Sequence, residues 1–138
     1  MVIISHRGNV RGRDPQMENA PKQIIDVLDR GYDCEIDVWY EDNWFILGHD
    51  EPVHAVPEHF LLRKGLWIHC KNLAALQMMP RTCNFFWHQQ DDFTLTSHGY
   101  IWTFPEKTTG RTSVIVDNSR NWASKNYECY GVCSDYIL

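Results

Sequence analysis

Two histidines, an arginine and a closely spaced pair of acids carry the candidate chemistry of this chain. His6 and Arg7 follow an apolar N-terminal run, and His49 follows a second apolar segment. Glu35 and Asp37 are separated by a single residue. Imidazoles can exchange protons with a nucleophile and a leaving group, and two carboxylates can share one divalent cation. These are the side chains needed to cleave a phosphodiester with the help of a metal.

The acidic pair predicts a metal site. In a strand over residues 34–40, Glu35 and Asp37 lie on the same face, because successive side chains alternate. Like charges this close repel unless a cation joins them, and carboxylate oxygens favour Mg²⁺ or Ca²⁺. His69, on a strand over residues 66–70, is a further candidate ligand, although imidazole is softer than these ions prefer. The alternative for the acidic pair is plain exposure to water.

Further side chains predict contacts with a substrate. Arg7 has a planar guanidinium that suits a pair of phosphate oxygens, and Lys71 would add a second cation on the face of His69. For Arg7 the alternative is a surface salt bridge, and for Lys71 an ordinary position at a strand end. Trp102, with Trp39 and Trp87, could line a pocket or belong to the core.

The apolar pattern predicts the elements that position these residues. Helices are expected over 20–29, ended by Gly31, and over 73–79, ended by Pro80. Strands are expected over 2–4, 34–40, 44–47, 66–70, 84–88, 94–96, 100–104, 113–116 and 132–134. Strands and helices alternate in the first half, which favours a parallel sheet with right-handed crossovers. Polar residues at the carboxyl ends of such strands are typical of α/β active sites.

Composition limits the class of protein. The chain has 138 residues, which predicts one domain over 1–138, and 43% of them are hydrophobic. Its formal net charge of −5 argues against general binding to nucleic acid. No apolar run approaches a membrane span, and residues 1–5 are too short for a signal sequence. Five cysteines without a Cys-x-x-Cys pair are typical of reduced thiols, so we expect a cytoplasmic protein.

Several short segments share motifs with one known family. They are His6-Arg7-Gly8, Glu18-Asn19, residues 31–38, Gly48-His49-Asp50, Ile68-His69-Cys70-Lys71 and residues 131–135. These segments resemble the glycerophosphodiester phosphodiesterase family, within the phosphatidylinositol-phospholipase-C-like barrels. Most of the resemblance lies in the first 71 residues. It implies a TIM-type barrel and a role for each of a group of residues: acid/base catalysis by His6 and His49, metal ligation by Glu35 and Asp37, phosphate contacts from Arg7 and Lys71, and ordering of the site by Glu18.

The chain departs from this family in two ways. The family usually has a glutamate, as a further metal ligand, where this chain has His69. The chain is also shorter than the roughly 200 to 250 residues of such barrels, and the missing length falls after Pro80. We therefore expect an α/β fold, a reduced TIM-type (β/α) barrel with several outer helices missing in the second half. Apolar residues among 85–87 would then lack cover, which favours a homo-oligomer.

The function expected from these residues is that of a metal-assisted phosphodiester hydrolase, similar to glycerophosphodiester phosphodiesterases. Its substrate would be a small glycerophosphodiester or a related polyol or sugar phosphodiester, with Mg²⁺ or Ca²⁺ as cofactor. The alternative is a catalytically silent module that binds a phosphorylated polyol or sugar, which the change to His69 favours. A purely structural α/β subunit would leave the acidic pair and both histidines unexplained.

Overall fold

The structure, a computed structural model, describes residues 1–138 and contains one ten-stranded sheet. The strands are β1 (Val2–His6), β2 (Asp33–Glu41), β3 (Trp44–Leu47), β4 (His54–Val56), β5 (Leu66–Cys70), β6 (Asn84–Phe86), β7 (Phe93–Leu95), β8 (Ile101–Thr103), β9 (Ser113–Val116) and β10 (Gly131–Ser134). The helices are α1 (Pro21–Asp29), α2 (Leu73–Met78) and two short 3₁₀ helices, η1 (Glu58–Leu62) and η2 (Trp122–Lys125).

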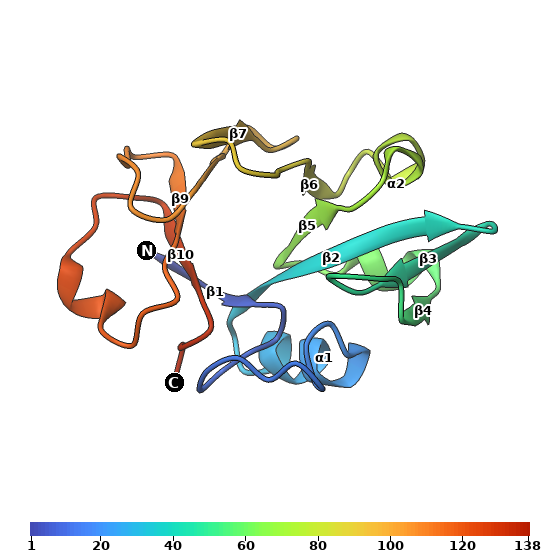
Figure 1. Cartoon of the computed structure of the whole chain (residues 1–138), viewed down its shortest axis with the longest axis horizontal. Coiled ribbons are helices and arrows are strands. Elements are labelled where there is room, and N and C mark those ends of the chain that lie inside the picture. Colours follow the sequence, from blue (N-terminus) through green and yellow to red (C-terminus); the bar gives the residue numbers. More distant parts are fainter.

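The sheet curls into a half-barrel (Figure 1). Strands β6, β5, β2, β1, β10, β9 and β8 lie in that order and are parallel, whereas β7 is antiparallel to β8. Strands β3 and β4 extend the far end of β2 as an antiparallel hairpin. No strand ladder joins β6 to β7, but Ser97 N donates to Phe85 O at 2.9 Å and Phe85 N donates to Ser97 Oγ at 2.9 Å.

The predicted TIM-type (β/α) barrel, even in reduced form, is wrong. The molecule is mostly sheet, with parallel and antiparallel strands, and its two α-helices both precede Pro80. In a TIM barrel a helix follows each strand and covers the outside. Here a tight turn at Gly99, with φ of 89°, joins β7 to β8. The longer loop from β9 to β10 holds only η2, whose Trp122 packs against the outer face of the sheet.

Side-chain alternation on β2 separates two faces of the sheet. Cys34, Ile36 and Val38 belong to the larger core on the outer face, where α1 and α2 pack. The opposite, inner face holds a smaller apolar cluster of Ile4, Trp67, Phe86, Trp102, Val114 and Cys133. This cluster fills the middle of the half-barrel and leaves the polar side chains to the two ends of the strands.

Several predictions about the elements are confirmed. Both expected helices form, and the four expected strands of the first half other than the hairpin arm are parallel, as the alternation of elements predicted. Strand β4 and helix η2 were not predicted. All five cysteines are free thiols. Neither α-helix is long and apolar enough to cross a membrane.

The expectation of an uncovered apolar surface at residues 85–87 is only partly correct. Phe86 is 2% exposed, because its ring points into the half-barrel and stacks on Trp102 with centroids 4.6 Å apart. Phe85 is half-buried and Trp87 is 39% exposed. The homo-oligomer therefore stays a prediction, and it rests on less surface than the sequence suggested.

Candidate active site

The candidate active site lies where the parallel strands end, at one edge of the half-barrel. Strand pairing sets its residues beside one another: His6 on β1 is opposite Glu35 on β2, and Asp37 on β2 is opposite His69 on β5. All four side chains alternate onto the inner face. The sequence placed Glu35 and Asp37 on one face of a strand, and the register adds the histidines of both neighbouring strands.

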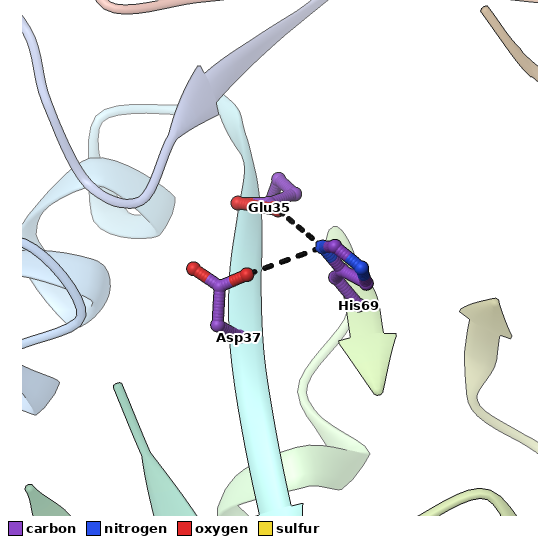
Figure 2. Close-up of side chains that lie close together, drawn as sticks. All are labelled: Glu35, Asp37 and His69. Carbon is purple, nitrogen blue, oxygen red and sulfur yellow. Dashed lines mark ion pairs between the residues drawn. The ribbon is translucent and has the colours of Figure 1, made fainter. Parts of the chain in front are cut away.

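Glu35, Asp37 and His69 converge on one point (Figure 2). His69 Nδ1 lies 3.2 Å from Asp37 Oδ1 and 3.9 Å from Glu35 Oε2. One ligand atom from each residue lies within 4.8 Å of those of the other two. Two carboxylates and one imidazole at this separation form a set of donors that one metal ion can bridge.

The hydrogen bond of His69 Nε2 determines the state in which the other ring nitrogen, Nδ1, faces this cluster. His69 Nε2 lies 2.8 Å from the backbone oxygen of His88, and a carbonyl oxygen can only accept. Nε2 therefore carries the proton, so in the neutral ring Nδ1 presents a lone pair to the two carboxylates. A backbone carbonyl behind the ring is the arrangement commonly found for histidines that bind metals.

The carboxylates themselves are buried and incompletely paired. Glu35 and Asp37 are 2% and 0% exposed, and Glu35 Oε1 and Asp37 Oδ1 accept no hydrogen bond. Burial and the adjacent charge of Asp37 raise the pKa of Glu35 well above its ordinary value. Burial alone would raise the pKa of Asp37 too, but His69 in its protonated form, together with Arg7 and Asn19, outweighs burial and holds that pKa low. Two buried oxygens without donors are free to accept a cation.

Arg7 sits beside this cluster in a backbone conformation that a side chain rarely adopts. Its φ is 60°, and the turn is secured by Arg7 N donating to Glu35 O at 2.9 Å. The guanidinium donates through Nη1 to Glu18 Oε2 at 3.0 Å, and its Nε lies 3.5 Å from Asp37 Oδ2. Arg7 Nε forms no hydrogen bond. Glu18 was expected to order the site, and it binds the guanidinium of Arg7, which lies beside the cluster.

Asn19 is a site residue to which the sequence assigned no role. Its Nδ2 donates to Asp37 Oδ2 at 2.9 Å, and its Oδ1 accepts from Asp37 N at 2.9 Å. Asn19 also has a positive φ of 60°, which asparagine tolerates better than most residues. These two bonds fix Asp37 and leave only its other oxygen, Oδ1, directed at the cluster. The adjacent Glu18-Asn19 motif was the available signal.

Asp135 is the second residue without an assigned role, and it partners His6. His6 Nδ1 lies 2.9 Å from Asp135 Oδ1, an acceptor, so Nδ1 carries the proton and Nε2 is free to exchange one. Asn9 Nδ2 donates to the same oxygen at 2.8 Å. Burial would raise the pKa of Asp135, but the bonds from His6 and Asn9 hold it below its ordinary value. Asp135 is ionised at neutral pH and orients the imidazole.

His49 reaches the site from the loop after β3. A Cβ at Gly48 would overlap the carbonyl oxygen of Glu51, so the turn before His49 requires glycine. Trp39 Nε1 donates to Gly48 O at 2.7 Å and ties this turn to β2. His49 Nδ1 lies 2.7 Å from Asp50 Oδ1. Burial lowers the pKa of His49, against the attraction of Asp37.

A cavity of about 210 Å³ brings these groups to a common space. Its polar lining comprises His6, Arg7, Glu35, His49, His69 and His88. Trp102 also lines it but is 3% exposed, so this residue forms the floor rather than a broad contact surface. A neighbouring cavity of about 330 Å³ shares three of the histidines and adds Trp39, Lys71 and Trp87. Lys71 thus lies near the site but lines the adjacent cavity.

His88 is the third functional candidate that sequence reasoning missed. It lies two residues beyond β6, its backbone oxygen accepts a hydrogen bond from His69, and it lines both cavities. Its Nε2 lies 2.7 Å from the backbone oxygen of Asp91. A histidine at or near the carboxyl end of a strand, like His6, was the signal.

A larger cavity of about 340 Å³ lies at the opposite edge, where the strands begin. Asp33, Trp67, Tyr100 and Tyr130 line it. Its carboxylate is paired, because Trp67 Nε1 donates to Asp33 Oδ2 at 2.9 Å. Volume alone would favour this cavity, but unpaired buried carboxylate oxygens and histidines paired with carboxylates occur only at the edge where the strands end.

Comparisons of the chain with protein-family models, with curated proteins and with solved structures find no match. The candidate site is therefore defined by its own geometry: two buried carboxylates and an imidazole nitrogen in contact, and two histidines held by carboxylates around one cavity.

Proposed function

We propose that this protein is a metal-assisted phosphodiester hydrolase that acts on a small glycerophosphodiester or a related polyol or sugar phosphodiester. One observation carries the proposal. Glu35 Oε1 and Asp37 Oδ1 are buried without a donor beside His69 Nδ1, and Glu35 and His69 line the cavity that also holds His6 and His49. Cation ligands and a proton-exchanging pair in one cavity are needed for catalysis and are more than binding requires.

The residues fit a divalent cation. Glu35, Asp37 and His69 would hold it, since each presents an atom to the same point and two of those residues have an unpaired buried oxygen. When bound, such an ion polarises a phosphoryl oxygen and lowers the pKa of a bound hydroxyl group or water. The second carboxylate oxygen of Asp37 is already fixed by Asn19, which orients the first.

The two histidines have the partners that proton transfer needs. His6 keeps its Nδ1 proton on Asp135, so its Nε2 accepts the proton of the attacking water or substrate hydroxyl group, and Asp135 stabilises the imidazolium that forms. The lowered pKa of His49 makes its protonated ring a readier donor to the leaving alkoxide. If the nucleophile is a neighbouring hydroxyl group of the substrate, a cyclic phosphate forms first and water opens it.

Positive side chains stabilise the charge that develops on phosphorus-bound oxygens. Arg7 borders the cavity, and its ion pairs with Glu18 and Asp37 hold its guanidinium in place. Lys71 extends the positive region into the adjacent cavity. The two cavities, about 210 and 330 Å³, suit a phosphodiester with a small alcohol on either side.

A binding module for a phosphorylated polyol or sugar is the alternative that one observation favours. His69 Nδ1 lies 3.2 Å from Asp37 Oδ1, so a protonated His69 would neutralise the carboxylates without any metal. In that case Arg7 and Lys71 would bind a phosphate that is never cleaved. This alternative leaves the pairing of His6 with Asp135 without a purpose.

Hydrolysis measurements separate the two functions. We expect turnover of bis(p-nitrophenyl) phosphate and of glycerophosphodiesters with an added divalent metal, and its loss in chelator or in the Glu35→Ala/Asp37→Ala variant. His6→Ala and His49→Ala should each reduce kcat by about 10²-fold or more. Activity that survives intact in both histidine variants would contradict the mechanism. A folded protein without turnover for any substrate or metal would support the binding module.

A further inference from the structure

We propose that the Glu35–Asp37–His69 cluster selects a first-row transition dication, Co²⁺ or Zn²⁺ before Mn²⁺, over Mg²⁺ and Ca²⁺. This deepens the proposed function and rests on its metal centre, since the identity of the ion decides how the protein must be assayed. It also revises the expectation of Mg²⁺ or Ca²⁺, which rested on the acidic pair.

The nitrogen donor is fixed in place before any ion arrives. The hydrogen bond from His69 Nε2 to His88 O, at 2.8 Å, directs Nδ1 to the carboxylates. The ring also stacks on Phe86, with centroids 5.2 Å apart and planes 13° from parallel. A ring held on its face and at its edge cannot easily turn away, so a bound ion must accept nitrogen. Imidazole suits Zn²⁺, Co²⁺ and their neighbours far better than Mg²⁺ or Ca²⁺.

The protein supplies few oxygen donors, which disfavours Ca²⁺ most. Ca²⁺ takes six to eight oxygens, whereas Mg²⁺ completes an octahedral oxygen shell with water and gains little from a nitrogen donor. Here Asp37 Oδ2 is engaged by Asn19, at 2.9 Å, and lies 3.5 Å from Arg7 Nε. That leaves Asp37 Oδ1 and the two oxygens of Glu35. A small mixed set of nitrogen and oxygen is enough for a transition dication, which accepts low coordination numbers and open positions.

Metal binding is measured on the full chain, stripped with chelator and without any substrate. Isothermal titration calorimetry should give one tight site for Co²⁺ and Zn²⁺, a weaker one for Mn²⁺, and Mg²⁺ and Ca²⁺ binding at least about tenfold weaker than Co²⁺. In the Co²⁺ protein, NMR should show one strongly shifted exchangeable proton, the Nε2–H of His69. The hydrogen bond to His88 O slows the exchange of this proton with water, which makes its resonance observable.

Two substitutions at one position test the role of the nitrogen. His69→Glu creates an all-oxygen set and should shift the preference toward Mg²⁺ and Ca²⁺, with loss of the shifted proton. His69→Gln is the second variant, in case three clustered carboxylates prevent folding, and should weaken Co²⁺ binding more than Mg²⁺ binding. His98→Gln is the matched control, because His98 is exposed at the opposite edge of the sheet and contacts only Thr82 O through its ring. It should leave the tight site unchanged.

Mg²⁺ or Ca²⁺ binding as tight as Co²⁺, or Co²⁺ binding that survives His69→Gln unaltered, would overturn the metal preference. So would the absence of any tight site, which would remove the metal centre as well. Tight Co²⁺ binding through His69, without hydrolysis of any phosphodiester, would uphold this inference and count against the proposed function alone.

Discussion

Three carboxylates alternate along the first half of strand β2, Asp33, Glu35 and Asp37, and they differ in their hydrogen-bond partners. Near the start of the strand, Asp33 accepts a hydrogen bond from Trp67 Nε1 at 2.9 Å. Further along, Glu35 Oε1 and Asp37 Oδ1 accept none, although both residues are more deeply buried. Burial raises the pKa of Asp33 and of Glu35 alike. The difference lies in the partners, and it separates a structural acid from two acids available to a cation.

The largest expected effect tests this difference through activity. Glu35→Gln and Asp37→Asn should each lower kcat/KM for phosphodiester hydrolysis by about 10³-fold, because metal-assisted stabilisation is worth several kcal/mol. Asp33→Asn keeps an oxygen that can accept from Trp67, and it should leave kcat/KM within about threefold of the parent value. Steady-state kinetics of the three variants, at saturating metal, provides the measurement.

The three variants control one another, since each removes one negative charge from the same strand. An equal loss of activity in all three would mean that only the total charge of the inner face matters. Loss in Asp33→Asn alone would move the active site to the opposite cavity and contradict the proposed location.

A second comparison concerns Asp135, a carboxylate that is hydrogen-bonded and that is proposed to orient His6 for catalysis. Asp135 holds His6 at 2.9 Å, and Asn9 holds Asp135 at 2.8 Å. Asp135→Asn should lower kcat by about 10²-fold with little change in KM, because the imidazole loses its orientation while the substrate contacts remain. His6→Ala should cost more, and adding Asp135→Asn to His6→Ala should cost little further.

The different effects of Asp135→Asn on kcat and on KM distinguish a positioning role of Asp135 from a purely structural one. Asn118→Ala serves as control, since Asn118 Oδ1 accepts only from Asp135 N, at 2.9 Å, and does not touch His6. If Asp135→Asn and Asn118→Ala both raised KM and lowered the melting temperature to the same extent, Asp135 would merely support the fold.

The local elements and the shared face of the acids could be predicted from the sequence. Helices α1 and α2 have apolar periodicity and clear end signals, and alternation on β2 is a property of any strand. The fold class could not be predicted in this way. Motif resemblance in the first half implied a reduced TIM-type barrel with outer helices missing in the second half, but the sheet is mixed, with β7 antiparallel to β8, and curls only into a half-barrel.

The hydrogen-bond partners of the candidate site residues also could not be predicted from the sequence. Asp135 lies 129 positions from His6, and only the parallel pairing of β1 with β10 brings them together. Asn19 was visible as part of a motif, but its two bonds to Asp37 depend on its positive φ. The direction of the His69 lone pair depends on a backbone carbonyl, at His88, which no pattern of side chains reports.

A third prediction concerns stability rather than activity. In chelator at pH 7, Glu35→Gln should raise the free energy of unfolding by about 1–2 kcal/mol, because the amide cannot ionise and so avoids the cost of burying a carboxyl group that is ionised in the unfolded chain. The sign follows from the raised pKa of Glu35: above its ordinary value of 4.5, the unfolded chain releases a proton that the folded chain retains, so stability falls as pH rises. Urea unfolding at pH 7 and pH 4 should show the gain shrink at the lower pH.

Asp33→Asn is again the matched variant, since its carboxylate already has a donor and the gain should be smaller. A Glu35→Gln protein less stable than the parent in chelator would mean that the carboxylate is satisfied without metal. That result would favour the binding module over the hydrolase.

The smallest expected effect comes from a fully paired carboxylate that lines neither cavity of the site. Asp117 accepts from Lys125 Nζ at 2.7 Å, Tyr127 Oη at 2.6 Å and Ser119 Oγ at 2.6 Å. Burial opposes ionisation, but these donors prevail and lower the pKa of Asp117 to about 2. Asp117→Asn should therefore reduce stability at pH 6 by about 1 kcal/mol.

The pH dependence of this loss distinguishes Asp117 from Glu35. A lowered pKa means that the stabilisation is complete above the ordinary value of 3.8 and disappears as pH falls through about 2. Thermal unfolding should give a difference between parent and Asp117→Asn that is constant from pH 5 to 7 and narrows below pH 4. Lys125→Met, which removes one donor and keeps the carboxylate, should reproduce part of it. A difference that grew on acidification would mean that Asp117 resembles Glu35, whose pKa is raised, and the contrast between the two carboxylates would fail.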